Sequence, residues 1–519
     1  MRSAAGAVRV EGMDPAAVVA VARSGAKVEA GEEARGRVRA ARRHVEGISS
    51  GERAVYGVNT GFGALANTRI APEAGRELQR SLLLSHAAGV GPFVEPEVVR
   101  GMMAVRVKTL AMGFSGVRVE LVDALADMLN AGVVPAVPEH GSLGASGDLA
   151  PLAHIGLCLC GEGWALEDGE AIPASEALSG RGLEPFVLRE KEGLSLINGT
   201  DGMLAMLVLA LEDFGLLLDT ADLAAAMSVE AAFGTDRVFR EELHALRPHP
   251  GQAESARNIS VMLSGSGIVS SHQASDHLVQ DPYSLRCAPV VGGAARDTLG
   301  FARLVARREL GSVTDNPVVL SDGRVESAGN FHGEPLALPL DFLAIAASEV
   351  GAISERRIDR LLDPSRSQGL PAFLAPEPGV NSGFMIAHYT AAALAEENRR
   401  LANPASTGSL PTSAMQEDHN SMGWSAGRKL RGVLANLSRI LAAELLCAAQ
   451  AIELRAPLEP APATRAAVEK IRERVPPTAR DRFLAPDLRT MQELVLSGEA
   501  VGAAMETVEH RVRATRRQP

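Results

Sequence analysis

Residues 141–151 hold the stretch of this chain with the most unusual potential chemistry. They read Gly-Ser-Leu-Gly-Ala-Ser-Gly-Asp-Leu-Ala-Pro, with three small residues in a row at Ala145, Ser146 and Gly147. Glycine lets a backbone bend sharply because it has no Cβ and tolerates positive φ. If the bend brings the Gly147 nitrogen against the Ala145 carbonyl carbon, a five-membered ring can close. Loss of water would then turn the Ser146 hydroxymethyl group into an exocyclic methylene, an electrophile that no ordinary side chain supplies.

Two simpler interpretations of this stretch compete with cyclisation. Glycines before a helix N-terminus can cradle an anion, but the Lys-Ser/Thr pair that completes a phosphate loop is missing here. An ordinary Gly/Ser-rich turn is the second alternative, and the stretch alone does not separate it from cyclisation. The apolar run at residues 149–160 is typical of a buried helix that follows the bend.

Other residues able to do chemistry gather in loops. Tyr56, one of three tyrosines, lies in the glycine-rich loop at residues 56–63. His86 lies near the end of an expected helix, where a lone histidine is more often a hydrogen-bonded core residue than a ligand contact. Asn198-Gly199 is a turn signal. Because loops on a rigid frame often carry function, four further polar loops are candidates: 279–287, 313–317, 329–335 and 415–419.

Composition narrows the class of protein. The formal net charge of −11 argues against nucleic acid as a main partner. The four cysteines are too few and too scattered for a disulfide framework, which favours a reduced, cytoplasmic compartment. Cys158 and Cys160 lack a second pair at metal-ligand spacing, so buried thiols are favoured over a zinc site and no metal is expected. Neither a signal peptide nor an unbroken membrane span is evident, so a soluble protein is expected.

The long apolar patterns predict a mainly α fold. Aromatic residues make up 3% of the chain, which is typical of helices packed through Ala and Leu rather than of a β-sandwich. We expect a long-helix bundle at residues 201–519 and a smaller mixed N-terminal domain at residues 1–200 that carries the Ala-Ser-Gly loop. Long helices are expected at residues 203–232, 336–362, 383–402 and 425–454. Short strands are expected at 318–320 and 324–326.

Residues 141–152 resemble the signature of the aromatic amino acid ammonia-lyases and aminomutases. In that family the Ala-Ser-Gly tripeptide cyclises by itself to methylidene-imidazolone, and motif matches here run from about Tyr56 to Asp487. The Ser85-His86 pair is of the type found in the members that act on histidine. Three positions depart from the common pattern without removing a catalytic group: Asp201, Met415 and Asn420.

The resemblance implies a role for each of several residues. Tyr56 would be the base that takes the β-proton of the substrate, with Tyr283 as a helper in proton handling. Arg286 would grip the substrate carboxylate through its planar fork, with Gln280 and Asn316 as polar neighbours.

A second group would serve the prosthetic ring and the substrate side chain. Asn198 and the N–H of Gly199 would stabilise charge on the imidazolone oxygen, and Phe331 would pack beside the ring. His86 and Glu417 would contact the substrate imidazole, whose N–H needs an acceptor and whose bare nitrogen needs a donor.

The reaction implied is loss of ammonia from L-histidine to give trans-urocanate. No dissociable cofactor is expected, because methylidene-imidazolone would form from Ala145, Ser146 and Gly147. The family resemblance also implies a homotetramer with shared active sites, and neither nucleic acid nor membrane as a partner. Two alternatives stay open: an aminomutase or a lyase for another aromatic amino acid, and a helical scaffold that has lost catalysis.

Overall fold

The computed structural model describes residues 7–49, 60, 75–273 and 278–515. Most of these residues are helical, which confirms the predicted mainly α fold. The chain forms two compact units, each assembled from separate segments. Unit 1 comprises Met1–Leu209, Ala302–Asp341 and Pro404–Arg428, and unit 2 comprises Ala210–Phe301, Phe342–Asn403 and Lys429–Pro519. The predicted division at residue 200 stays a prediction.

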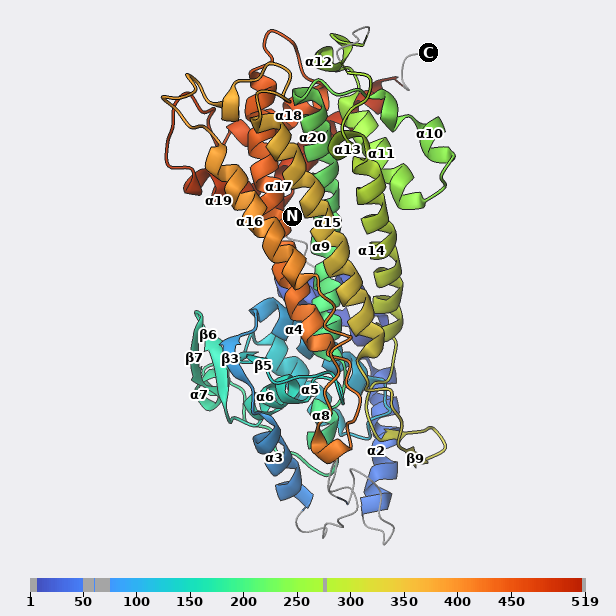
Figure 1. Ribbon diagram of the computed structural model, residues 1–519. Coiled ribbons are helices and arrows are strands. Elements are labelled where there is room, and N and C mark those ends of the chain that lie inside the picture. The colour runs from blue at the N-terminus through green and yellow to red at the C-terminus, as the bar shows by residue number, and fades with distance from the viewer. Residues whose placement is uncertain (1–6, 50–59, 61–74, 274–277, 516–519) are drawn as a thin grey trace. The chain divides into compact units, whose positions relative to one another are not determined.

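The strands found in the described residues are short and belong to unit 1. They form a parallel pair, two antiparallel pairs and a three-stranded antiparallel sheet in the order β4-β6-β7. Figure 1 shows β3, β5, β6 and β7 close to α6 and α7. The strand bounds are β1 Val8–Arg9 with β2 Val28–Glu29, β3 Val90–Phe93 with β5 Pro138–His140, β4 Val134–Pro135, β6 Trp164–Glu167, β7 Glu170–Pro173, and β8 Val318–Val319 with β9 Val325–Glu326.

Helices of unit 1 surround an apolar core, and local signals set their ends. In α1, Asp14 accepts the N–H of Ala17 at 2.8 Å, Pro15 opens the helix, and Gly25 ends it at φ +68°. The helix α4 is buried along nearly its whole length. The bounds are η1 Val10–Gly12, α1 Pro15–Ser24, α2 Glu32–Ser49, α3 Gly75–His86, α4 Pro96–Ala111, α5 Val119–Asn130, α6 Leu149–Leu159, α7 Ala174–Ser179, α8 Glu192–Ile197 and η6 Ser413–Met415.

Four long helices match the apolar stretches of the sequence. The expected helices at 203–232, 336–362, 383–402 and 425–454 are confirmed as α9 Asp201–Ala231, α15 Glu334–Leu362, α16 Met385–Leu401 and α17 Gly423–Glu453. The remaining helices are α10 Glu241–Ala245, α11 Pro250–Leu263, α12 Gly267–Ser270, α13 Tyr283–Arg286, α14 Ala288–Leu310, α18 Pro462–Arg472, α19 Ala485–Ser497 and α20 Glu499–Thr515, with the short η4 Arg237–Phe239 and η5 Ala372–Leu374.

Two of these helices, α15 and α17, are long and apolar enough to cross a membrane by length and composition alone. Their most apolar windows are 61% and 83% buried inside the protein. Helices that form the core of a folded protein pass the same test, so burial is the simpler account of their apolar character.

A buried carboxylate links three long helices within unit 2. Glu444 on α17 is fully buried and accepts hydrogen bonds from Ser228 on α9 and from Ser354 and Arg357 on α15. The Arg357 Nη2 atom lies 2.8 Å from Glu444 Oε2. Because a buried charge needs a partner of opposite sign, this ion pair constrains how the helices pack.

Removal of Arg357 is therefore expected to destabilise the protein strongly. Arg357→Met leaves the Glu444 carboxylate buried without its cation, and breaking such a pair costs about 3–5 kcal/mol. Arg400 on α16, whose side chain is 67% exposed and pairs with the exposed Glu396, provides the control, and Arg400→Met should change stability little. Thermal unfolding of the three proteins measures the difference, and equal midpoints for both variants would contradict this account.

Candidate active site

The Ala-Ser-Gly loop lies between β5 and α6 and touches a second loop at one point. Gly147 has φ +71° and forms a parallel bridge with Gly199. A Cβ built on Gly147 would overlap the Gly199 carbonyl group. The helices α6 and α9 begin two residues after these two glycines, at Leu149 and Asp201. Two helix N-termini, each with a partial positive charge, therefore start beside the loop.

Ser146 makes a direct hydrogen bond to the second loop. Its Oγ donates to Asn198 Oδ1 at 2.7 Å. The Asn198 Nδ2 group donates to the carbonyl oxygen of Asn316 at 2.9 Å and lies 3.5 Å from Asp315 Oδ1. A carbonyl oxygen can only accept, so these contacts fix which end of the Asn198 amide faces Ser146. Both Ser146 and Ala145 stay partly exposed.

A buried ion pair fixes the loop at residues 313–317 against α8. Lys191 Nζ donates to Asp315 Oδ2 at 2.9 Å and to Ser195 Oγ at 3.0 Å, and both charged side chains are fully buried. The Asp315 Oδ1 atom also accepts the N–H of Asn316 at 2.7 Å. Burial lowers the pKa of Lys191, and the charge of Asp315 opposes that lowering. Lys191 itself has φ +67°, a strained conformation for a residue with a Cβ.

A second buried ion pair fixes the main chain of the Asn198 turn. Arg106 on α4 donates from Nη1 to the carbonyl oxygens of Ser195 at 2.9 Å and Asn198 at 3.1 Å. Its Nη2 atom donates to Asp201 Oδ2, and neither side chain of this pair is exposed. Arg106 and Lys191 together hold both the main chain and the side chain around Asn198. The Asn198 amide is thus preorganised before any ligand arrives.

Asp148 joins the Ala-Ser-Gly loop to the start of α9. Its Oδ2 atom accepts the N–H groups of Gly202 at 2.8 Å and Met203 at 3.0 Å, and its Oδ1 atom accepts from Ser142 Oγ at 3.0 Å. Burial raises the pKa of Asp148 to about 7, opposed by the hydrogen bond from Met203 and reinforced by the charge of Asp201. The carboxyl therefore titrates near neutral pH although it caps a helix N-terminus.

Two further loops bind the backbone just before Ala145. The carbonyl oxygen of Gly144 accepts from Ser421 Oγ at 2.9 Å and from the N–H of Gly333 at 3.2 Å. The N–H of Met422 donates to the carbonyl oxygen of Leu143 at 2.8 Å. The half-buried Phe331 precedes Gly333 by two residues. Unit 1 thereby brings the 329–335 loop and the segment after Glu417 to the Ala-Ser-Gly loop.

His86 ends α3 with one ring nitrogen already occupied. Its Nδ1 atom lies 2.9 Å from the carbonyl oxygen of Leu82 and 3.1 Å from Ser85 Oγ. Since the carbonyl can only accept, Nδ1 carries the proton and Nε2 of the neutral ring is an acceptor. Burial lowers the pKa of half-buried His86, opposed by the Leu82 carbonyl and by the negative charge of Glu417. His86 and Glu417 therefore lie within electrostatic reach of each other.

Three predicted substrate contacts belong to unit 2. The guanidinium carbon of Arg286 lies 4.7 Å from the ring centroid of Tyr283, whose side chain is 71% exposed. Among the residues that the structure describes, Arg286 has no carboxylate partner and its buried Nε has no acceptor. This leaves a planar donor group able to bind a substrate carboxylate. Gln280 lines a cavity of about 170 Å³ in the same unit.

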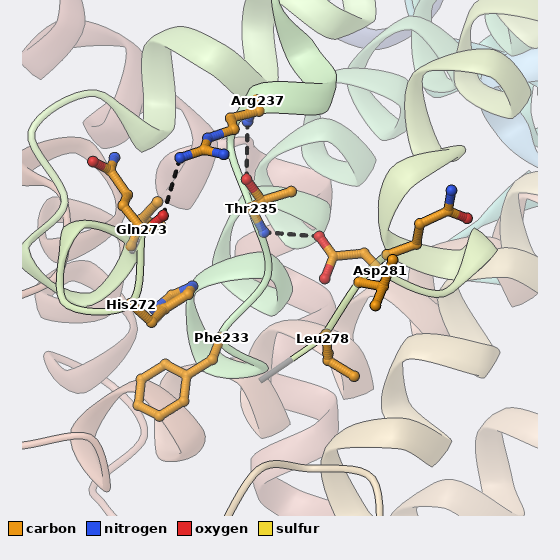
Figure 2. Close-up of a pocket in the computed structure, with 10 residues that line it drawn as sticks. Phe233, Thr235, Arg237, His272, Gln273, Leu278 and Asp281 are labelled. Atoms are coloured by element: carbon orange, nitrogen blue, oxygen red, sulfur yellow. Dashed lines mark hydrogen bonds between the residues drawn. The ribbon is translucent and has the colours of Figure 1, made fainter. Parts of the chain in front are cut away.

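Figure 2 shows that cavity, whose wall joins the turn after α9 to the loop before α13. The N–H of Thr235 donates to Asp281 Oδ2 at 2.7 Å, and Arg237 Nη2 donates to the carbonyl oxygen of Gln273 at 3.0 Å. His272 Nε2 contacts the carbonyl oxygen of Gly234 at 3.0 Å. The bond between Thr235 and Asp281 holds the start of the 279–287 loop in place.

The predicted site residues thus fall into three groups. Contacts in unit 1 directly join the Ala-Ser-Gly loop to Asn198 and Gly199, and Asn198 in turn donates to Asn316. His86, Phe331 and Glu417 belong to the same unit, whereas Gln280, Tyr283 and Arg286 belong to unit 2. Tyr56 lies outside the described residues.

The sequence analysis assigned no role to four charged residues that hold this site together. Three of them carried a signal, since each interrupts a run of apolar or small residues, as Arg106 does within Met102–Leu110. Nothing local to the sequence pairs them across the chain, because the partners lie up to 124 residues apart. The residues are Arg106, Asp148, Lys191 and Asp315.

Cys158 and Cys160, the closely spaced pair, have unreactive thiols. Cys158 is buried and free, and burial raises the pKa of Cys158 and of Cys160 to about 12. Thiols with so high a pKa stay protonated and are poor nucleophiles and metal ligands at neutral pH. Within the part of the chain that the structure describes, no group of three or more His, Cys, Asp or Glu could hold a metal ion.

Comparison with known proteins identifies the class. Residues 13–473 match the family of aromatic amino acid lyases. The histidine ammonia-lyase of Streptomyces coelicolor is 56% identical over 499 residues, which cover 96% of this chain and 98% of that protein. The crystal structure of histidine ammonia-lyase from Trypanosoma cruzi matches with a TM-score of 0.88 at 41% identity, covering 95% of this chain and 94% of that one. Tyrosine aminomutase from Streptomyces globisporus matches with a TM-score of 0.91 at 38% identity, covering 97% and 99%.

The chain belongs to the aromatic amino acid lyase family. The Ala-Ser-Gly loop, the Asn198 turn and the long helices are therefore parts of one known type of enzyme, as the sequence resemblance indicated.

The buried Asp148 predicts a pH dependence of stability. Its pKa is raised from 3.8 to about 7 in the folded protein, so the stability it contributes is complete below about pH 4 and is lost as pH rises through 7. The loss at pH 8 is on the order of 4 kcal/mol. The isosteric Asp148→Asn variant does not titrate, so its thermal midpoint should fall less between pH 5 and pH 8 than that of the wild type.

An exposed aspartate gives the control for this measurement. Asp127 is exposed near the end of α5, and Asp127→Asn should keep the pH profile of the wild type. Parallel profiles for wild type and Asp148→Asn would show that Asp148 does not titrate in this range.

Proposed function

We propose that this chain is a histidine ammonia-lyase, which eliminates ammonia from L-histidine and releases trans-urocanate. The relatives named for this activity support the substrate, since one is 56% identical over nearly the full length of both chains. The observation that carries the proposal is the contact of Ser146 Oγ with Asn198 Oδ1 at 2.7 Å, beside a glycine that has no room for a Cβ.

The loop fits a methylidene-imidazolone ring made from Ala145, Ser146 and Gly147. Ring closure needs the Gly147 nitrogen to approach a carbonyl carbon, and the left-handed Gly147 packed on Gly199 is a backbone bent sharply enough to favour it. Partial exposure of Ser146 leaves its Cβ open to a ligand. The group supplies an electrophilic carbon that draws electrons from the breaking C–N bond, so no dissociable cofactor is needed.

The residues around this ring orient it and stabilise charge. In the observed geometry Asn198 offers its oxygen to Ser146, while its N–H groups face Asn316 and Asp315. We therefore assign Asn198 to the orientation of Ser146. Stabilisation of charge on the ring oxygen would come from the N–H of Gly199 and from the N-termini of α6 and α9. Phe331 would limit access of water to the ring.

The substrate would be held at both ends. Arg286 offers a free planar donor group for the carboxylate, with Gln280 and Asn316 as polar neighbours. His86 and Glu417 would contact the imidazole ring. Tyr56 would remove the β-proton, and Tyr283 would help to move protons. The N–H of an imidazole ring pairs with an acceptor in such a pocket, whereas a phenyl ring leaves both His86 Nε2 and Glu417 without a donor.

A homotetramer with shared active sites is part of the proposal. Large apolar side chains are exposed on α14, α15 and α16 of unit 2, which supports burial of these faces against other copies. The exposed side chains are Phe301 at 47%, Phe342 at 42%, Ile345 at 41%, Ile386 at 59% and Tyr389 at 65%. The compartment that we propose is the cytoplasm, in keeping with four free cysteines.

Turnover of L-histidine tests the function directly. Incubation should produce urocanate, seen by its near-ultraviolet absorbance, with one ammonia per turnover. Ser146→Ala removes the hydroxymethyl group and should lower kcat by at least about 10³-fold while the fold stays intact. A β-amino acid as the product would favour an aminomutase, as the likeness to tyrosine aminomutase allows. No product from any aromatic amino acid would indicate a scaffold without catalysis.

Gly147→Ala, compared with a second glycine variant, tests whether ring formation needs the close approach of Gly147 to Gly199 or only a glycine at positive φ. The added Cβ meets the Gly199 backbone, so the loop cannot keep its path, and the intact mass of the variant should retain the two waters that ring formation removes. Gly182 has a similar φ of +70° with open space around its Cβ position. Gly182→Ala therefore carries similar strain but should lose both waters. Loss of two waters from Gly147→Ala would refute the role of the Gly147–Gly199 contact.

A further inference from the structure

The segment that carries Glu417 forms a closed and strained loop. The N–H of Thr412 donates to the carbonyl oxygen of Glu417 at 2.9 Å, and the N–H of Glu417 donates back to Thr412 at 3.3 Å. Between them three successive residues have positive φ: Ser413 at +53°, Ala414 at +51° and Met415 at +70°. Residues with a Cβ disfavour this conformation, so the contacts at the two ends of the loop must hold it in place.

A side-chain hydrogen bond at the base of the loop reaches the Glu417 carboxylate. Thr412 Oγ1 donates to Glu417 Oε2 at 3.0 Å. The fully buried Asn420 donates from Nδ2 to the carbonyl oxygen of Leu410 and to Thr412 Oγ1, the latter at 3.3 Å. Because Thr412 accepts from Asn420, its own hydrogen is left for Glu417. The donors therefore run in one direction, from Asn420 through Thr412 to Glu417.

The buried side chain of Asn420 uses its donor group and leaves its acceptor unpaired. Its Oδ1 atom has no hydrogen-bond partner within the described residues. Buried polar atoms are nearly always bonded, and an unsatisfied one is unfavourable. The side-chain Nδ2 group makes both of the hydrogen bonds given above. The backbone N–H of Asn420 also donates to Ser409 Oγ at 2.8 Å. The Asn420 side chain therefore acts as a hydrogen-bond donor, and one of its two acceptors is Thr412.

The same segment is fixed to the Ala-Ser-Gly loop within unit 1. Ser421 Oγ bonds the carbonyl oxygen of Gly144 at 2.9 Å, one residue after Asn420. The direction of the Glu417 carboxylate is therefore set by a short chain of contacts that begins at the loop of Ser146. Glu417 Oε1 makes no hydrogen bond to the part of the chain that the structure describes, so this oxygen is open to a ligand.

We propose that Thr412 and Asn420 are positioning residues that aim the Glu417 carboxylate at the N–H of the substrate imidazole. Thr412 occupies Oε2 and leaves Oε1 for the ring. The inference rests on the proposed histidine-cleaving function, because the donor that Oε1 would accept is the ring N–H of histidine. It assigns recognition of the substrate ring to two residues that touch neither the substrate nor the prosthetic group.

Binding of two ring analogues without the amine provides the test. Imidazolepropionate presents a ring N–H, and 3-phenylpropionate presents a ring of similar size without one. Thr412→Val keeps the shape of Thr412 and removes its hydroxyl. We expect imidazolepropionate to bind about tenfold more weakly to this variant, as loss of one hydrogen bond to a charged group implies. Binding of 3-phenylpropionate, weak in the wild type, should stay within about twofold, since neither Thr412 nor its partner meets a polar atom of that ring.

Two companion variants make the outcome decisive. Thr412→Ser restores the hydroxyl and should recover wild-type binding of imidazolepropionate. Thr407→Val removes an exposed hydroxyl that bonds only the carbonyl oxygen of Pro404 at 3.2 Å in the same segment, and it should change nothing. For L-histidine, Thr412→Val should raise KM far more than it lowers kcat, and the intact mass should still show loss of two waters.

Asn420→Leu tests the upstream donor through a double-mutant cycle. Its effect on imidazolepropionate binding should be present in the wild-type background and absent in Thr412→Val, because both act through one hydroxyl. The inference fails if Thr412→Val binds both analogues as the wild type does, if Thr412→Ser does not recover, or if both analogues weaken equally. A wild-type protein that does not convert L-histidine would instead overturn the proposed function.

Discussion

The close approach of Gly147 to Gly199 is the constraint on which the rest of the site depends. Two loops far apart in sequence share a backbone bridge there, and neither can carry a side chain at the contact. Asp148 then reaches across to cap α9, and Ser146 reaches Asn198. Each of these contacts needs the two backbones at this separation, so a single Cβ at Gly147 would displace all of them together.

Charge surrounds this contact in an unusual density for a protein interior. Arg106 and Lys191 supply two buried cations, and Asp148, Asp201 and Asp315 supply three buried carboxyls. The set is electrically balanced when Asp148 holds a proton, which agrees with the direction in which burial moves the pKa of Asp148. Such networks are costly to bury, and Arg106 Nε and Asp201 Oδ1 have no hydrogen-bond partner among the described residues. They nevertheless define one arrangement of the backbone where an apolar core would tolerate several. A single backbone arrangement is what the proposed cyclisation of the Ala-Ser-Gly loop would need.

Much of the fold could be predicted from the sequence, because long helices leave a strong apolar period. The boundaries of α9 and α17 fall within two residues of the expected ones. The helix α14 was not predicted, since Gly292, Gly293 and several charged residues weaken its pattern. The site was predictable where a motif fixes local chemistry, as at Ala145–Gly147. It was not predictable where the site depends on pairing across the chain, as for Lys191 with Asp315, or on an irregular local loop, as for Thr412 with Glu417.

The hydrogen bonds from Ser421 and Met422 to residues 144 and 143 also indicate when, during synthesis of the chain, the Ala-Ser-Gly loop reaches its final conformation. When the ribosome has just added Gly147, it has not yet added the segments that later bind this loop. The bent backbone is complete only after some 270 further residues have been translated, as the distance from Ser146 to Ser421 along the chain implies. Under the proposed function, ring closure would therefore take place in the nearly finished, folded polypeptide, and the nascent chain would carry no reactive electrophile during synthesis.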